Sequence, residues 1–167
     1  MIKFLKNGGR LYIEGALIGY NNSKGQYSDY GLWEYLGAKY MNLGNYMKSV
    51  DITHLTGVPS TFTDGFSFKY ATGDIPANNA DTLGADSGGF VIFKSDGDSG
   101  RVIANIGKTG DKEYRTIVSS VIFGALYGGE HKRSELISKY LGFLTENLSE
   151  SSTDFEKETN PLSNWLH

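Results

Sequence analysis

The sequence predicts an α/β fold in which helices flank a mainly parallel sheet that also carries one antiparallel hairpin. Three observations lead to this prediction. A short helix runs directly into a strand near the start of the chain, two strands flank a turn-rich connection over residues 90–106, and a β-branched strand over 114–123 precedes an amphipathic helix over 130–144. We expect one domain over residues 1–148 and a polar linker or tail over 149–167.

The composition is that of a globular domain and argues against several classes of function. Hydrophobic residues make up 39% of the 167 residues and charged residues 21%, which is too apolar for a disordered tail. Sixteen Lys and Arg face 19 Asp and Glu without a basic cluster, so we expect neither nucleic acid nor a membrane as a partner. With no cysteine and three scattered histidines, we expect no metal site, no cofactor and no thiol nucleophile.

The first elements are a helix end and a strand. Residues 1–5 are amphipathic, and the following Asn-Gly-Gly suits a helix C-cap. The run over 10–14 is mostly apolar and ends at Gly15, as expected for an interior strand of a parallel sheet that is covered on both faces. Because lysines and glycines interrupt the apolar stretch, we expect no secretory signal sequence within it.

The middle of the chain carries weaker signals. A polar loop over 19–29 leads into a short helix whose apolar positions run from Leu32 to Tyr40, and Gly37 is expected to end it. Residues 41–65 are rich in turn-forming residues and are predicted to be mostly loop. The alternation over 66–70 predicts a half-buried strand, and an irregular passage follows it.

The second half has the clearest pattern. Strands over 90–94 and 101–106 flank a Ser-Asp-Gly-Asp-Ser-Gly connection, which favours an antiparallel hairpin with a solvated turn. That turn lacks the closing glutamate of a calcium loop. The strand over 114–123 and the 3.6-residue periodicity of the last helix place further side chains inside. The predicted core includes Leu11, Ile13, Val91, Ile117, Val121 and Leu141.

Two segments of the chain carry a resemblance to a known family: residues 8–19 (Gly-Gly-Arg-Leu-Tyr-Ile-Glu-Gly-Ala-Leu-Ile-Gly), and residues 117–126 with the helix after them. The first is similar to the nucleophile-elbow strand and turn of the class I glutamine amidotransferase-like superfamily, in the form found in secreted bacterial multidomain proteins and peptidases. The second is similar to the late strand and last helix of that superfamily. The resemblance covers about residues 1–145 and implies a flavodoxin-like three-layer sandwich. It also implies that the first βα units are missing, so that the chain is a fragment, has a smaller sheet, or is completed by a partner chain.

Two departures from the superfamily argue against its activity. Active members place a cysteine at the centre of a Gly-x-Cys-x-Gly turn, whereas the turn over 15–19 has Leu17 there. Their catalytic His and Glu follow the late strand, but residues 119–126 contain neither. We therefore predict a non-catalytic structural or interaction module of a larger secreted or cell-surface bacterial protein, with a protein partner or a homodimer.

Two alternatives stay open beside this prediction. A hydrolase with a rebuilt site at the strand ends would use Glu14 and His131, because ligands of open α/β sheets collect at the carboxyl ends of strands. A carbohydrate-binding module would use the polar loop, where Tyr20, Asn21 and Tyr27 supply aromatic faces and an amide for a sugar ring. The simpler interpretation is that Glu14 caps a turn and that His131 is an exposed helix residue.

Overall fold

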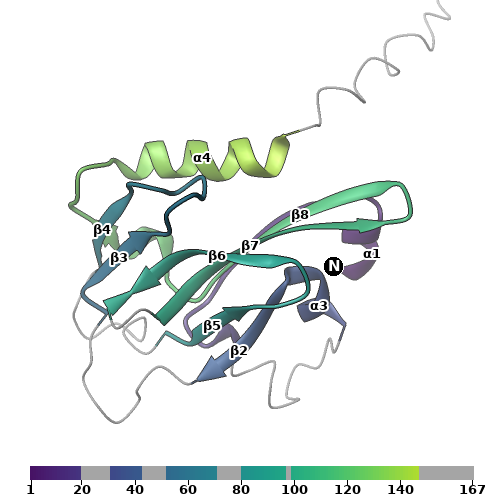
Figure 1. Cartoon of the computed structure of the whole chain (residues 1–167), viewed down its shortest axis with the longest axis horizontal. Helices are drawn as coiled ribbons and strands as arrows, with labels where there is room; N and C mark the ends of the chain where they lie inside the picture. The colour runs from purple at the N-terminus through teal and green to yellow at the C-terminus, as the bar shows by residue number, and fades with distance from the viewer. Residues whose placement is uncertain (20–30, 43–51, 71–79, 97–98, 147–167) are drawn as a thin grey trace, which may run out of the picture.

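The computed structural model describes residues 1–19, 31–42, 52–70, 80–96 and 99–146, and strands account for 42% of the structure. Within these ranges the strands form one seven-stranded sheet and one two-stranded sheet. The larger sheet is curled into a half-barrel (Figure 1). The strands are β1 (Arg10–Glu14), β2 (Ala38–Asn42), β3 (His54–Gly57), β4 (Ser67–Tyr70), β5 (Thr82–Ala85), β6 (Gly89–Ser95), β7 (Ser99–Thr109), β8 (Lys112–Ser119) and β9 (Leu126–Tyr127).

The predicted flavodoxin-like three-layer sandwich with a mainly parallel sheet is wrong. The seven strands lie in the order β1-β8-β7-β6-β3-β4-β9, and among the described pairs only β1 and β8 run parallel. Parallel neighbours need a long crossover connection, usually a helix. The short connections between β6, β7 and β8 instead reverse the chain directly, so these strands form an antiparallel meander.

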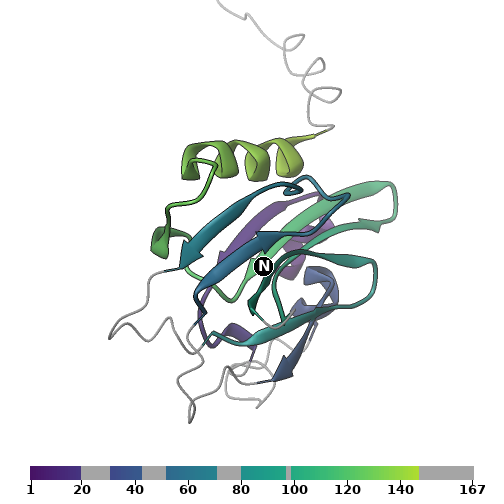
Figure 2. The same ribbon diagram turned by 60° about the vertical axis from the view of Figure 1, so that its left-hand side comes forward.

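The helices cover opposite faces of the sheet. They are α1 (Ile2–Lys6), α3 (Leu32–Leu36) and α4 (Arg133–Thr145), with a 3-10 turn η3 over Phe123–Ala125. Figures 1 and 2 show α4 along one face, while α1, α3 and the β2–β5 sheet lie on the other side. Gly37 ends α3 as predicted, because its φ of +61° is a left-handed cap that glycine adopts without strain. Tyr40 was expected on that helix but lies in β2.

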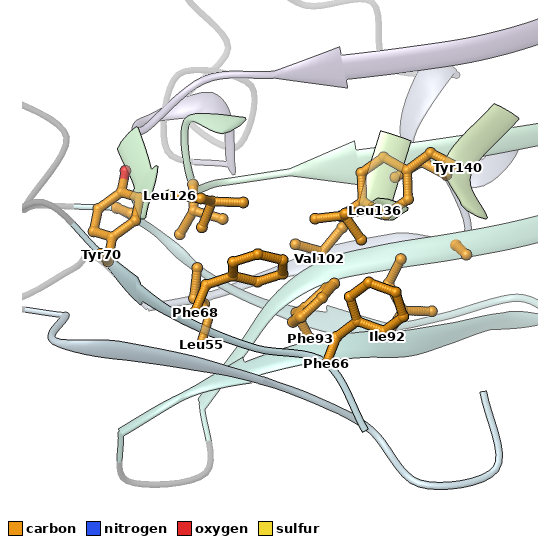
Figure 3. Close-up of a cluster of buried hydrophobic side chains, with 14 of the residues drawn as sticks. Leu55, Phe66, Phe68, Tyr70, Ile92, Phe93, Val102, Leu126, Leu136 and Tyr140 are labelled. Atoms are coloured by element: carbon orange, nitrogen blue, oxygen red, sulfur yellow. The ribbon is translucent and has the colours of Figure 1, made fainter. Parts of the chain in front are cut away.

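Two hydrophobic clusters correspond to the two faces. The larger lies between the sheet and α4 and includes the fully buried rings of Phe68, Tyr70 and Phe93 (Figure 3). The smaller holds Leu5 of α1 and Leu36 of α3 against the opposite face. Adjacent β1 and β8 residues alternate between the clusters, as the two-residue period of a strand requires.

Several predicted elements are confirmed and others are wrong. The strands over 10–14 and 66–70, the hairpin and the last helix are present close to their predicted bounds. β3 and β5, in passages predicted as irregular, were missed, because both are strands of only four residues. β5 pairs with the distant β2, and β3 lies between β4 and the more distant β6. β1 was expected to be an interior strand covered on both faces, yet it is an edge strand of the described sheet and only partly buried.

The prediction for Leu141 is also wrong. This side chain is 54% exposed, whereas Leu136 and Tyr140 of the same helix are buried. The apolar stripe of α4 is wider than the part of the helix that the sheet covers. Ile137, one turn before Leu141, is likewise 38% exposed. The two side chains extend the apolar surface of α4 beyond its contact with the sheet.

Candidate functional site

Glu14 stands at the carboxyl end of β1, where its carboxylate fastens the chain that follows β8. The Tyr12 hydroxyl donates to its Oε2 at 2.5 Å, and the Phe123 N–H donates to the same oxygen at 2.8 Å. Burial first, and then the hydrogen bond to Glu14, raise the pKa of Tyr12. Glu14 therefore holds the start of η3 against β1, as its simpler interpretation expects.

The loop between β8 and η3 is held by further side chains. The Ser119 hydroxyl donates to the Val121 carbonyl at 2.6 Å, and the Ile122 N–H donates to the Tyr70 hydroxyl at 3.0 Å. Burial raises the pKa of Tyr70. These bonds and those of Glu14 satisfy the polar groups of a turn that leaves the sheet, which is what a structural corner requires.

His131 precedes α4 and contacts a different set of residues. Its ring stacks on Phe66 with the centroids 4.3 Å apart, and its Nδ1 lies 2.9 Å from Oε2 of Glu135. The hydrogen bond to His131 is the main cause that lowers the pKa of Glu135. Within the described residues, Glu14 bonds to Tyr12 and Phe123, whereas His131 contacts Phe66 and Glu135, so the two residues share no partner. The structure therefore gives no support to a catalytic pair formed by these two residues.

The elbow-like turn and the buried charges have structural partners. In the turn after β1, the Ile18 N–H donates to the Gly15 carbonyl at 3.0 Å, and Leu17 occupies the centre. Arg101 is buried, and its guanidinium donates to the Ser95 hydroxyl and to the Ala80 carbonyl.

Nowhere in the described ranges do three His, Asp or Glu side chains gather as metal ligands. None of the described helices has the length and apolar character to span a membrane.

Tyr20, Asn21 and Tyr27 lie outside the described residues, but the chain on either side of their loop borders a pocket of about 290 Å³. Trp33 and Tyr40 supply aromatic surface there, and the carboxylates of Glu34 and Asp86 supply acceptors. The pairing of Ala38 in β2 with Ala85 in β5 brings Asp86 close to α3. Sequence reasoning missed Tyr40, Glu34 and Asp86, because no local signal shows that β2 and β5 pair. The full lining is Gly19, Trp33, Glu34, Ala38, Lys39, Tyr40 and Asp86.

The outer side of β1 is a second candidate surface. The Arg115 N–H donates to the Gly9 carbonyl, and the Gly15 N–H donates to the Ser119 carbonyl, so these odd-numbered positions face β8. Backbone groups alternate in direction along a strand. The N–H and C=O groups of Arg10, Tyr12 and Glu14 therefore point away from β8, where the described structure has no neighbouring strand.

Exposed apolar side chains flank this strand. On the α4 face, Phe62 stacks on Phe143 with the ring centroids 4.7 Å apart, which marks the side of α4 that points toward β6 and the β3–β4 loop. Ile137 and Leu141 lie on the other side of the helix by its 3.6-residue period, hence toward β1. On the opposite face, the exposed ring of Phe4 lies against Gly9 at the start of β1.

Comparison with protein-family models, curated proteins and solved structures gave no match for this chain. The geometry described above is thus the basis for its functional assignment.

Proposed function

We propose that this chain is a non-catalytic interaction module that binds a protein partner by adding a β-strand to the open edge of β1. The observation that carries the proposal is the row of outward backbone groups on Arg10, Tyr12 and Glu14. An unpaired strand edge is a template for pairing with another chain, and strand addition is an established mode of peptide recognition.

The edge lacks the devices that usually block such pairing. Proline, a central lysine and a β-bulge each discourage edge-to-edge contact. β1 contains neither Pro nor Lys, and its register with β8 runs without a shift from Arg10 to Glu14. Its central residues, Leu11, Tyr12 and Ile13, are apolar or aromatic and partly buried. An added strand would find both backbone partners and apolar surface.

The contacts of the predicted hydrolase residues favour this role over catalysis. Glu14 fixes a turn and His131 is paired with Glu135, so each is engaged separately. A general base must instead lie within hydrogen-bond reach of the group that it activates.

Peptide selection combined with two substitutions at one position tests strand addition. Extended peptides of random sequence would be displayed and selected on chains immobilised at low density. In Tyr12→Pro the outward N–H is lost while the bonds to β8 are kept, since Leu11 and Ile13 face β8. Tyr12→Ala is the matched control, because it loses the same ring but keeps the N–H.

We expect selected peptides to bind both the wild type and Tyr12→Ala. Their affinity for Tyr12→Pro should be at least tenfold lower. Circular dichroism would confirm that both variants are folded. The absence of any selected peptide, or equal binding to both folded variants, contradicts the proposal.

The pocket beside α3 supports carbohydrate binding as a second candidate function. Its pairing of Trp33 and Tyr40 with two carboxylates suits a sugar, whose ring stacks on aromatic faces while its hydroxyls donate to acceptors. Glycan-array binding that Trp33→Ala and Tyr40→Ala abolish, and that Tyr127→Ala on distant β9 leaves intact, would support this function. An empty array would contradict it.

A further inference from the structure

We infer that the strand added to β1 is β1 of a second copy of this chain, antiparallel and centred on Tyr12. The inference rests on the proposed function and names its partner. The segment Arg-Leu-Tyr-Ile-Glu is complementary to its own reverse: a basic residue begins it, an acidic residue ends it, and an aromatic residue stands in the middle.

The direction of the backbone groups sets the register. The backbone N–H and C=O groups of Arg10, Tyr12 and Glu14 point outward. An antiparallel copy therefore places Tyr12 opposite its equivalent, and Arg10 opposite Glu14 of the other copy. In this register, each facing pair exchanges two N–H···O=C bonds. A shift by two residues would leave one end of each strand without a partner.

The charges favour the same register. Within its own chain, Arg10 is held by Glu113 of β8: its Nη1 donates to the main-chain oxygen at 2.8 Å, and its Nη2 lies 3.7 Å from Oε1. Both hydrogen bonds to Glu14 use Oε2, so within the described residues its Oε1 accepts none. Opposite charges directly across a strand pair are stabilising. The inferred pairing would place the basic Arg10 of one copy opposite the acidic Glu14 of the other at each end of the strand.

The helices supply apolar contact on both sides of the paired strands. A two-fold axis through the facing Tyr12 residues puts both α4 helices on one face of the joined sheet and both α1 helices on the other. Leu141 is 54% exposed and lies on the β1 side of α4, so it would approach the α4 of the other copy. Phe4, 53% exposed, occupies a comparable position on the opposite face.

The symmetry also limits the assembly to two chains. A two-fold interface uses the same surface on both subunits and is closed. The other end of the sheet, β9, is a strand of only two residues and offers no comparable edge. The result would be a continuous sheet that passes through both chains.

Light scattering on the purified chain, with a charge exchange across the two copies, tests this inference. Arg10→Glu places two acids opposite each other at both ends of the paired strands, and Glu14→Arg places two bases there. We expect each variant alone to dissociate at least tenfold more readily than the wild type. Mixing the two variants restores opposite charges at both ends, so we expect a one-to-one heterodimer.

Arg10 and Glu14 also make bonds within their own chain, so a second pair of variants leaves both residues unchanged. Leu141→Lys should weaken the dimer at least tenfold, whereas Tyr127→Lys, an equally exposed substitution on β9, should leave it unchanged. A wild-type chain that stays monomeric at several hundred micromolar overturns the inference. A dimer that resists Leu141→Lys, or whose charge variants fail to recombine while folded, overturns it too.

The peptide selection separates the two proposals. If the chain is monomeric but its β1 edge still binds peptides in the Tyr12-dependent way described above, the second copy is the wrong partner and strand addition stands. If neither occurs, both proposals fail.

Discussion

The two edges of the seven-stranded sheet are built differently. At one edge, β9 pairs with β4 through two residues, and the chain then turns away at Gly128 and Gly129, both of which have positive φ. At the other edge, β1 pairs with β8 over five residues in continuous register. A short strand and a tight turn close the β9 edge, whereas the β1 edge stays available for pairing.

The largest expected effect is a difference in stability between core substitutions made beneath the two edges. Ile117 of β8 is fully buried beside β1, and Leu126 of β9 is 5% exposed. We expect Ile117→Ala to lower the free energy of unfolding by about 4 kcal/mol and Leu126→Ala by about 2 kcal/mol, because the short strand can relax around the cavity. Urea denaturation followed by circular dichroism measures both. Equal losses would show that the edges are equally rigid.

A glycine substitution tests how the β9 edge is closed. A Cβ at Gly129 would lie 2.0 Å from the Ser67 carbonyl oxygen, and the φ of +97° disfavours any side chain. We expect Gly129→Ala to cost about 1–3 kcal/mol of stability. Gly124→Ala is the control, since a Cβ there meets nothing within 4 Å, and it should change stability by less than about 0.5 kcal/mol. A neutral Gly129→Ala would mean that the turn readily rearranges.

Removing the charge of Glu14 measures how much this carboxylate stabilises the β1 edge. Its carboxylate accepts two hydrogen bonds, and bonds to a charged group are stronger than neutral ones. We expect Glu14→Gln to cost about 1 kcal/mol, seen as a fall of a few degrees in Tm by thermal denaturation. Glu130→Gln, at an exposed position, should leave Tm unchanged. The hydrolase alternative expects the opposite for Glu14→Gln, namely lost activity at an unchanged Tm.

The smallest effect concerns the attachment of β3, two strands from β9. Burial raises the pKa of Asp96, but hydrogen bonds from Thr53 and His54 outweigh it, and the pKa lies below its ordinary value. A depressed pKa stabilises the fold above the ordinary value and loses this contribution as the pH falls through the folded-state value. We expect the stability of Asp96→Asn to vary less with pH below about 4 than that of the wild type. Hydrogen-exchange protection of β3 at pH 3 and pH 7 measures this pH dependence in both proteins. An identical pH dependence in the wild type and in Asp96→Asn would refute the role of Asp96.

Local pattern predicted most elements of this chain, and long-range pairing decided what it missed. The alternation over 66–70 and the periodicity of α4 concern neighbours in sequence, so those elements are found where expected. Whether strands run parallel depends on which segments meet, and no local signal carries that information. The predicted fold class is wrong for this reason, although the one parallel pair among the described strands, β1 with β8, joins the two segments on which the resemblance rested.

The candidate surfaces follow the same division. Leu141 was placed in the core because its helical position is apolar, yet the sheet edge ends before reaching it. Tyr40 was assigned to a helix, and its place in the pocket depends on β2 pairing with β5. Only Glu14 was singled out at a strand end from sequence alone, and the structure gives that carboxylate a role in holding a turn.

The pairing of β1 with β8 also determines the order in which the molecule can fold. Arg10 bonds to Glu113, 103 positions later in the chain, whereas β6 pairs with β7, and β7 with β8, which directly follow in the sequence. Contacts between distant segments form slowly because a long loop must close first. We therefore expect the meander to form before β1 joins it, so that β8 exposes its own edge during that interval. At high concentration, β1 of one folding molecule competes for β8 of another, so refolding yield should fall as concentration rises.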